Sequence, residues 1–179
     1  MTRPLAARPG RAAGLARAAL LPLLGLLAAA AGHAGAEPPA RSNVFNDPFV
    51  QASNGLPGCA VPQGPLLSAE EAREQAHWRV EKGTTCYEYG RCRLPNAYLY
   101  DAEIVPRVAR FIARSDRFAH SSVWLLGQRR WVYLKGCVAT AAMAKDLVRE
   151  VRLIDDVEAV IDELMVGTKG RPPYEVRQP

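Results

Sequence analysis

The sequence predicts an α+β protein whose core is an α-β-β-α-β two-layer sandwich: a three-stranded mixed sheet with two helices on one face. Apolar residues recur at helical spacing over 101–118 and again over 140–154. Two stretches of period-two alternation, 122–126 and 131–135, lie between them. A further apolar segment, 157–166, follows as the closing strand. An N-terminal helical extension that carries cysteines, with disulfides expected, precedes this core.

The first 36 residues have the features of a signal peptide. Four arginines are followed by the apolar run Ala18–Ala31 and then by Ala34-Gly35-Ala36, a small-residue cleavage pattern. The apolar run is shorter than a helix that spans a bilayer, so an uncleaved signal anchor is the less favoured alternative. We predict export to the periplasm through a Sec-type signal peptide, with cleavage after Ala36.

The charge of the chain lies largely in this leader. The whole sequence has 23 basic and 18 acidic residues, a net charge of +5. Removal of the four leader arginines leaves 19 basic against 18 acidic residues, so the mature chain has a net charge of +1. Bulk charge therefore does not support nucleic-acid binding. Any anionic partner has to be recognised by a local cluster of charge.

Residues 37–100 form the predicted N-terminal extension. Its first part, 37–65, is rich in Pro, Gly, Asn and Ser and shows no sustained period, which is typical of an irregular lead-in. Ser68 and Glu71 form an S-x-x-E capping box that opens a helix predicted at 68–82. Gly83 is well placed to end that helix.

Four cysteines remain in the mature chain: Cys59, Cys86, Cys92 and Cys137. An even number in an exported protein predicts two disulfides, and the sequence does not select among the three possible pairings. A metal or redox site is less favoured, because C-x5-C is not a redox spacing. Only His77 and His120 remain as histidines in the mature chain.

The core elements follow in order. The first helix is predicted at Asp101–Phe118; Pro106 lies near its start, so either the helix begins a few residues later or its first turn is distorted. Its apolar face consists of Ile104, Val108, Phe111 and Ile112. Gly127–Arg130 joins the two strands as a hairpin. Thr140 can cap the second helix, 157–166 supplies the third strand, and 167–179 is predicted to be a flexible tail.

Alternation separates two faces of the predicted sheet. Val123, Leu125, Val132 and Leu134 share the face toward the helices. Trp124, Leu126, Trp131 and Tyr133 share the opposite face. This aromatic face is either an open contact surface or is covered by the extension. We favour the cover, because Cys137 points to the same side as Tyr133 and can form a disulfide with Cys59 or Cys92 in the extension.

The ordered segments resemble the BON domain, a small bacterial envelope module associated with phospholipid and outer-membrane contact. The family pattern has an acidic residue and apolar residues on a helix, then V-x-L-x-G-x-V, a second helix, and a closing G-V-x-x-V-x-N-x-L. The matching residues are Asp101, Ile104, Val108, Ile112, Val132, Leu134, Gly136, Val138, Val157, Val160 and Leu164. The resemblance covers 101–166 in a single copy. Arg130, Asp156 and Asp162 stand where the family usually has Gly, Gly and Asn.

The resemblance implies a non-catalytic periplasmic protein that binds the cell envelope, with anionic phospholipid surfaces as its first partner. Contact with the membrane is expected to be peripheral. The alternative is a protein–protein adaptor in an envelope complex, which uses the sheet edge or the Trp/Tyr face. No nucleic-acid partner and no cofactor are predicted.

The candidate anion-binding residues are arginines on the first helix and in the hairpin: Arg107, Arg110, Arg114, Arg129 and Arg130. On the helix they lie, with Arg117, in one sector beside the apolar face and can attract anionic head groups. The alternative is a solvated helix face whose long side chains cover the core edge. A catalytic role is not predicted, because the sequence contains no G-x-S-x-G, H-E-x-x-H or phosphate-loop motif.

Overall fold

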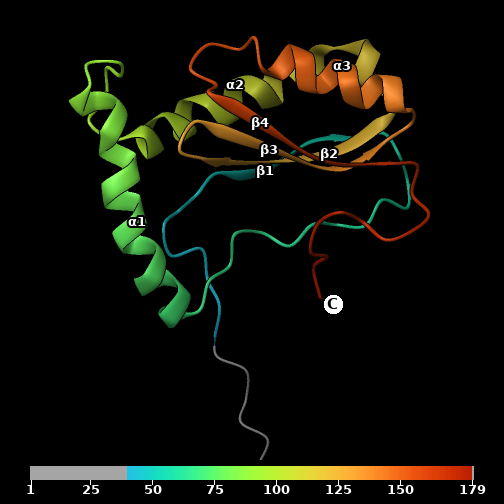
Figure 1. The fold of residues 1–179 in the computed structure, drawn as a ribbon. Helices are drawn as coiled ribbons and strands as arrows, with labels where there is room; N and C mark the ends of the chain where they lie inside the picture. The colour runs from blue at the N-terminus through green and yellow to red at the C-terminus, as the bar shows by residue number, and fades with distance from the viewer. Residues whose placement is uncertain (1–39, 179) are drawn as a thin grey trace, which may run out of the picture. The chain divides into compact units, whose positions relative to one another are not determined.

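The computed structural model describes residues 40–178, so the predicted signal peptide and its cleavage site after Ala36 lie outside the described residues. The sheet has the order β1-β2-β3-β4 (Figure 1). Its strands are β1 (Phe49–Asn54), β2 (Ser121–Gln128), β3 (Trp131–Val138) and β4 (Ala159–Val166). The helices are α1 (Ala69–Glu88), α2 (Asp101–Arg114) and α3 (Ala141–Val151). The predicted α+β class is confirmed.

The α2-β2-β3-α3-β4 unit has the predicted element order. Strands β2 and β3 form an antiparallel hairpin, and β3 pairs in parallel with β4 through the α3 crossover. Helices α2 and α3 lie on the same face of the sheet (Figure 1). Between them and the sheet lies the core, which includes Val123, Leu125, Val132 and Leu134 as predicted. The burial of these side chains is the main source of stability for such a two-layer fold.

The prediction of three strands was wrong, because the extension adds a fourth. Strand β1 pairs antiparallel with β2, with an irregularity in register between Gln51 and Ser53. The Ser53 hydroxyl lies 2.7 Å from that of Ser121 and accepts a hydrogen bond from the Val123 N–H. This strand has no strong local signal, since the irregularity interrupts its alternation and its partners lie about 70 residues away in sequence.

Helix α2 begins at Asp101 and continues through Pro106, directly after a 3-10 turn at Ala97–Tyr100. The sequence allowed either a helix that begins a few residues later or one with a distorted first turn, and the later start is therefore excluded. The helix ends at Arg114 and not at Phe118. A second 3-10 turn, Asp116–Phe118, follows it and places the buried Phe118 ring edge-on to Phe111.

Helix α1 confirms the predicted capping box, in which Ser68 and Glu71 each bond the backbone of the other. These bonds to Ser68 lower the pKa of the Glu71 carboxyl. The helix does not end at Gly83, however, but runs to Glu88. Gly83 lets Asn96 pack closely on the helix there, since a Cβ at this position would lie 2.5 Å from the Asn96 side chain, which would have to move.

The glycine of the V-x-L-x-G-x-V pattern has a clear structural reason. Gly136 has a φ of 127°, which L side chains rarely adopt. A Cβ there would lie 2.1 Å from the carbonyl oxygen of Ser122 on the neighbouring strand. The close approach of β2 and β3 at this point therefore requires glycine.

Candidate functional site

The turn between β2 and β3 consists of Arg129 and Arg130. Their φ angles are 59° and 66°, the left-handed conformation that a two-residue type I′ hairpin turn requires. The carboxylate of Asp101, at the start of α2, accepts hydrogen bonds from both backbone N–H groups, at 2.6 Å and 2.8 Å. A buried acid therefore anchors the turn to the helix layer.

The environment of Asp101 changes its titration. Only 1% of the residue is exposed, and this burial raises the pKa of its carboxyl to about 7, although the two N–H donors act in the opposite direction. The sequence identified Asp101 only as the acidic residue that opens the helix. Its two donors lie 28 and 29 residues away, so no local pattern could reveal the contact.

Two of the five candidate arginines are already engaged within the protein. Arg107 donates a hydrogen bond to the Asp155 carbonyl at 2.6 Å, and its guanidinium lies 3.6 Å from the Asp156 carboxylate. Arg130 donates from Nε to the Asp156 carbonyl at 2.8 Å and stacks over Tyr100 at 5.1 Å. These contacts tie α2 and the hairpin to the turn before β4.

The other three candidates are free of ion pairs to the rest of residues 40–178. Arg110 and Arg114 are exposed on α2. Arg129 lies with its guanidinium 4.7 Å from the centroid of the Trp131 ring. Arg117, the last member of the helical sector, is paired with Glu150 and Asp146 of α3. The candidate arginines are thus of two kinds: some are engaged in contacts within the protein, and the others have no ion-pair partner there.

The aromatic face lies on the side of the sheet opposite α2 and α3. Trp124 and Leu126 are each only 7% exposed, so this face is not an open surface at β2. Trp131 and Tyr133 of β3 are half-buried, and burial, with the nearby Glu163 carboxylate, raises the pKa of the Tyr133 hydroxyl. Figure 1 shows the segment 55–67, here called the arm, and the C-terminal tail on this side of the sheet.

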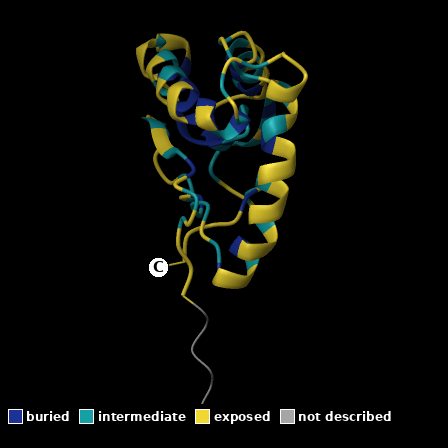
Figure 2. Cartoon of the chain, turned by 90° about the vertical axis from the view of Figure 1, so that its left-hand side faces the viewer, coloured by how far each residue is buried: buried dark blue, intermediate teal, exposed yellow. Residues whose placement is uncertain are grey.

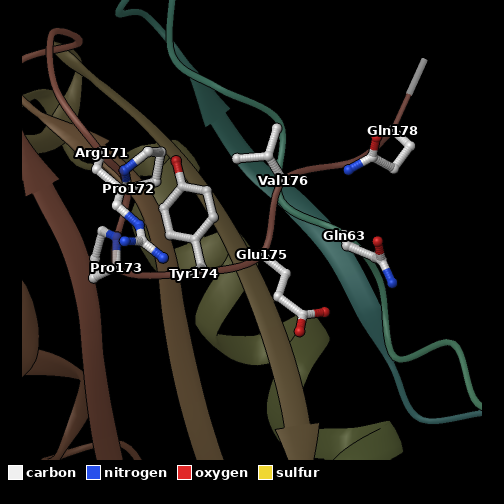
Figure 3. A pocket seen from close by; sticks show the side chains of 8 residues that line it. All are labelled: Gln63, Arg171, Pro172, Pro173, Tyr174, Glu175, Val176 and Gln178. Atoms are coloured by element: carbon white, nitrogen blue, oxygen red, sulfur yellow. The ribbon is translucent and has the colours of Figure 1, made fainter.

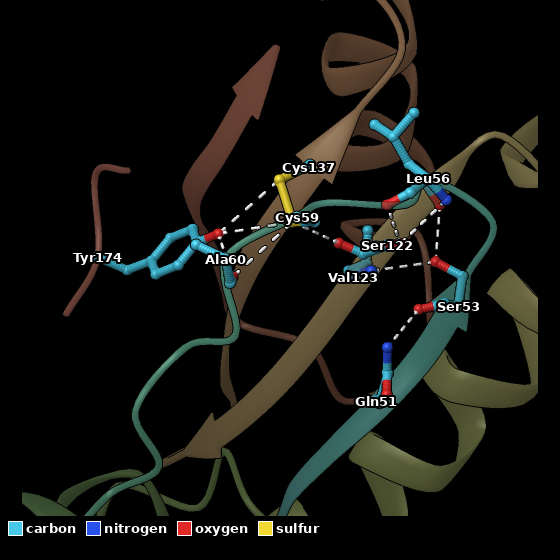
Figure 4. The surroundings of a disulfide bond; sticks show 10 residues. Gln51, Ser53, Leu56, Cys59, Ala60, Ser122, Val123, Cys137 and Tyr174 are labelled. Carbon is cyan, nitrogen blue, oxygen red and sulfur yellow. Dashed lines mark hydrogen bonds between the residues drawn. A yellow bond between two sulfur atoms is a disulfide. The ribbon is translucent and has the colours of Figure 1, made fainter. Parts of the chain in front are cut away.

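A disulfide holds the arm to the sheet. Cys59 is bonded to Cys137 of β3, one of the two pairings considered from the direction of the Cys137 side chain. The hydroxyl of Tyr174, from the tail, donates to the Ala60 carbonyl at 2.8 Å beside this disulfide (Figure 4). Cys86 and Cys92 form the second disulfide, so the prediction of two disulfides is confirmed and no cysteine is free.

The tail at 167–178 is held by several contacts. The backbone N–H of Gln63 donates to Glu175, and that of Arg177 donates to Val61, so the tail runs antiparallel to the arm. A hollow of about 730 Å³ lies between Gln63 and the tail residues (Figure 3). Its walls combine two prolines, Tyr174 and Val176 with side chains of both charges. Because positive and negative side chains both line this hollow, it has no excess of one charge that would select an anionic or a cationic ligand.

Helix α1 is attached through a buried ion pair that the sequence did not indicate. Arg79 donates to Asp47 at 2.7 Å, and the two side chains are 12% and 6% exposed. The Arg79 guanidinium lies between the rings of Phe45 and Tyr98, at 4.0 Å and 4.4 Å from their centroids. Most of the remaining helix surface is exposed (Figure 2). This buried ion pair therefore helps to position a largely solvated helix, together with the packing of Gly83 on Asn96 and the Cys86–Cys92 disulfide.

Among residues 40–178, no helix combines the length and the apolar character needed to cross a bilayer.

Comparison with known proteins gives one match. A family model described as the BON domain matches residues 100–168, a segment of 69 residues that begins one residue before α2 and ends just after β4. No curated protein and no solved structure matches the chain. The extension with α1, the arm and β1 lies outside the matched segment.

Proposed function

Residues 100–168 are a BON domain, and on that premise we propose that this protein is a non-catalytic periplasmic protein that binds anionic phospholipid surfaces of the cell envelope. BON domains are associated with phospholipid and envelope binding, which supports this class of function. Periplasmic location rests on the signal-peptide features of residues 1–36. The protein would contact the membrane surface peripherally, with the outer membrane as the preferred membrane.

The observation that carries the proposal is that three of the candidate arginines have no ion-pair partner among residues 40–178 and can therefore bind an external anion. Arg110 and Arg114 project from α2 without an ion pair inside the described part of the chain, and Arg129 extends from the hairpin. Each basic side chain near an anionic membrane contributes about 1 kcal/mol of binding. Arg107 and Arg130, which we expected to share this role, instead hold the turn at Asp155 and Asp156.

The test is co-sedimentation of the mature chain with liposomes across a salt series. We expect pelleting with vesicles that contain phosphatidylglycerol, no pelleting with pure phosphatidylcholine, and release as salt screens the charges. Arg110→Ala with Arg114→Ala should weaken the binding, whereas Lys145→Ala with Arg152→Ala, an equal loss of charge on α3 and the residue that follows it, should have a smaller effect. Failure of the wild-type chain to pellet at low salt would end the lipid proposal.

A second candidate is an adaptor that binds another envelope protein. It is favoured by the sheet order, because β4 is paired on one side only, with β3. A partner strand could extend the sheet at that edge. The covered state of Trp124 and Leu126 makes the aromatic face the weaker of the two predicted adaptor surfaces. Salt-insensitive binding to a protein partner, with no binding to vesicles, would favour this function.

A further inference from the structure

A basic pocket lies where the end of α1 meets the β2–β3 hairpin. It has a volume of about 280 Å³ and is lined by Lys82, Thr85, Cys86, Arg91, Ala97, Arg129 and Glu158. Three of these residues are cations and one is an acid. Two of the cations come from the extension and the third from the BON domain, so the pocket exists only because α1 is docked beside the hairpin.

The three cations have no ion-pair partner among the described residues. Each lies instead against an aromatic ring. Lys82 is 4.4 Å from the ring centroid of Trp78, Arg91 is 5.7 Å from that of Tyr89, and Arg129 is 4.7 Å from that of Trp131. Such contacts orient a cation without neutralising its charge. The pocket therefore presents preoriented positive charge that is available to an anion.

The acid Glu158 and the disulfide of Cys86, both in the pocket lining, are also compatible with an anionic ligand. The Glu158 carboxylate lies 3.9 Å from the guanidinium of Arg130, a residue outside the pocket lining. Arg130 therefore compensates part of the negative charge of Glu158. The Cys86–Cys92 bond closes the loop that carries Arg91 and limits how far this side chain can move from the pocket. Cationic charge exceeds acidic charge in the lining, and the backbone that bears it is restrained.

Exposed aromatic side chains stand on the same side of α1 as the pocket. Trp78, Lys82, Thr85 and Tyr89 follow each other at intervals of four, three and four residues, which places them on one side of a helix. Trp78 is 51% exposed and Tyr89 is 73% exposed. Amphipathic aromatic rings beside cations are typical of surfaces that lie at the membrane–water interface.

We propose that this pocket binds the phosphodiester head group of an anionic glycerophospholipid in a bilayer, while Trp78 and Tyr89 contact the interface around it. This inference rests on the proposed lipid-binding function and assigns its specific site to the extension–hairpin junction. The occupant follows from charge complementarity and from size, since three cations converge on a space that holds a head group and not a folded partner.

Three double variants, each lacking two positive charges, test the assignment: Lys82→Ala with Arg91→Ala in the pocket, Arg110→Ala with Arg114→Ala on α2, and Lys145→Ala with Arg152→Ala on α3. Binding to mixed phosphatidylcholine–phosphatidylglycerol vesicles is measured by co-sedimentation. The pocket variant should lose about 30-fold in affinity, from about 1 kcal/mol for each cation, and the α3 variant less than about threefold. Far-UV circular dichroism and a thiol assay check that each variant is folded with both disulfides.

Tryptophan quenching gives an independent measurement. Vesicles of brominated phosphatidylglycerol should quench the fluorescence of the wild-type chain. Trp124 is covered, and Trp131 lies against the pocket residue Arg129, so Trp78→Phe should lose part of this quenching and Trp78→Phe with Trp131→Phe nearly all of it. Equal losses of affinity in the pocket and α3 variants, or unchanged quenching in Trp78→Phe, would overturn the inference alone. Failure of the wild-type chain to bind these vesicles overturns the proposed function as well.

Discussion

Arg130 donates a hydrogen bond from Nε to the carbonyl oxygen of Asp156, at 2.8 Å. Both residues have left-handed backbones, with φ angles of 66° and 70°. Both also occupy positions at which the BON pattern usually has glycine. The two substitutions therefore keep the conformation that glycine would adopt and add a contact between the hairpin and the turn before β4, which offsets part of the conformational cost.

This relationship predicts different effects for two substitutions of Arg130. Arg130→Ala loses the hydrogen bond and the stacking on Tyr100 but keeps a side chain at positive φ, so we expect a destabilisation of about 1–3 kcal/mol. Arg130→Gly loses the same contacts but relieves the backbone, which should restore about 1 kcal/mol. Urea denaturation measures both free energies of unfolding. An Ala variant as stable as the Gly variant would contradict a strained turn.

The buried acid predicts a specific dependence of stability on pH. The pKa of Asp101 is raised from its ordinary value of 3.8 to about 7 by burial. The neutral form is therefore favoured by folding, and its stabilising contribution, present below about pH 4, is lost as the pH rises to about 7. One pKa unit corresponds to about 1.4 kcal/mol, so the loss is on the order of 3–4 kcal/mol.

Asp101→Asn removes this titration but keeps one oxygen acceptor for the hairpin N–H groups. Denaturation of both proteins at several pH values should show the wild-type chain losing stability relative to the variant as the pH rises. The other carboxyl groups are common to both proteins, so their effects cancel in the difference. Parallel stability curves across this range would show that Asp101 is ionised in both the folded and the unfolded state.

The Asp47–Arg79 ion pair predicts how α1 is held. Removal of either partner leaves a buried charge without its counter-ion, so Asp47→Ala and Arg79→Ala should each cost about 3–5 kcal/mol. Hydrogen exchange should rise along α1 in both variants. Arg73→Ala is the matched control, since Arg73 is exposed on the same helix. If α1 stays protected without Arg79, the ion pair does not dock it.

The two disulfides are expected to contribute unequally to stability. Cys59 and Cys137 are separated by 78 residues, Cys86 and Cys92 by six. Removal of the first bond by replacing both cysteines with alanine should cost about 2–5 kcal/mol, because a longer closed loop restricts the unfolded chain more. The Cys86→Ala, Cys92→Ala variant should lose less. Thermal unfolding of the two double variants compares them directly, and the reverse order would contradict this explanation.

The segment that the BON family model matches, 100–168, could be predicted from the sequence because its signals are local. The cap at Thr140 and the alternation of Val132 and Leu134 each depend on neighbours within a few residues, as does the Ser68–Glu71 capping box of α1 in the extension. Strand β1 could not be predicted in the same way. Its hydrogen bonds go to β2, about 70 residues away, and its own alternation is interrupted at Ser53.

The candidate site was only partly predictable for a related reason. Charge and helical spacing identified the arginines, but they do not tell which guanidinium is already paired. Asp155 and Asp156 engage Arg107 and Arg130 because the chain returns to α2 and the hairpin before β4. The basic pocket combines Lys82 and Arg91 with Arg129, residues separated by up to about 50 positions, and only packing brings them together.

The sequence by itself determined the α+β class, the order of the core elements, the face to which the residues of β2 and β3 point and the resemblance of residues 100–168 to the BON family. These depend on periodicity and on caps, whose physical causes act over a few residues. Only the tertiary structure decided that the extension adds a strand, that Cys59 is the partner of Cys137, and which arginines are free. Those outcomes depend on long-range contacts, whose energies are realised only once distant segments of the chain are packed together.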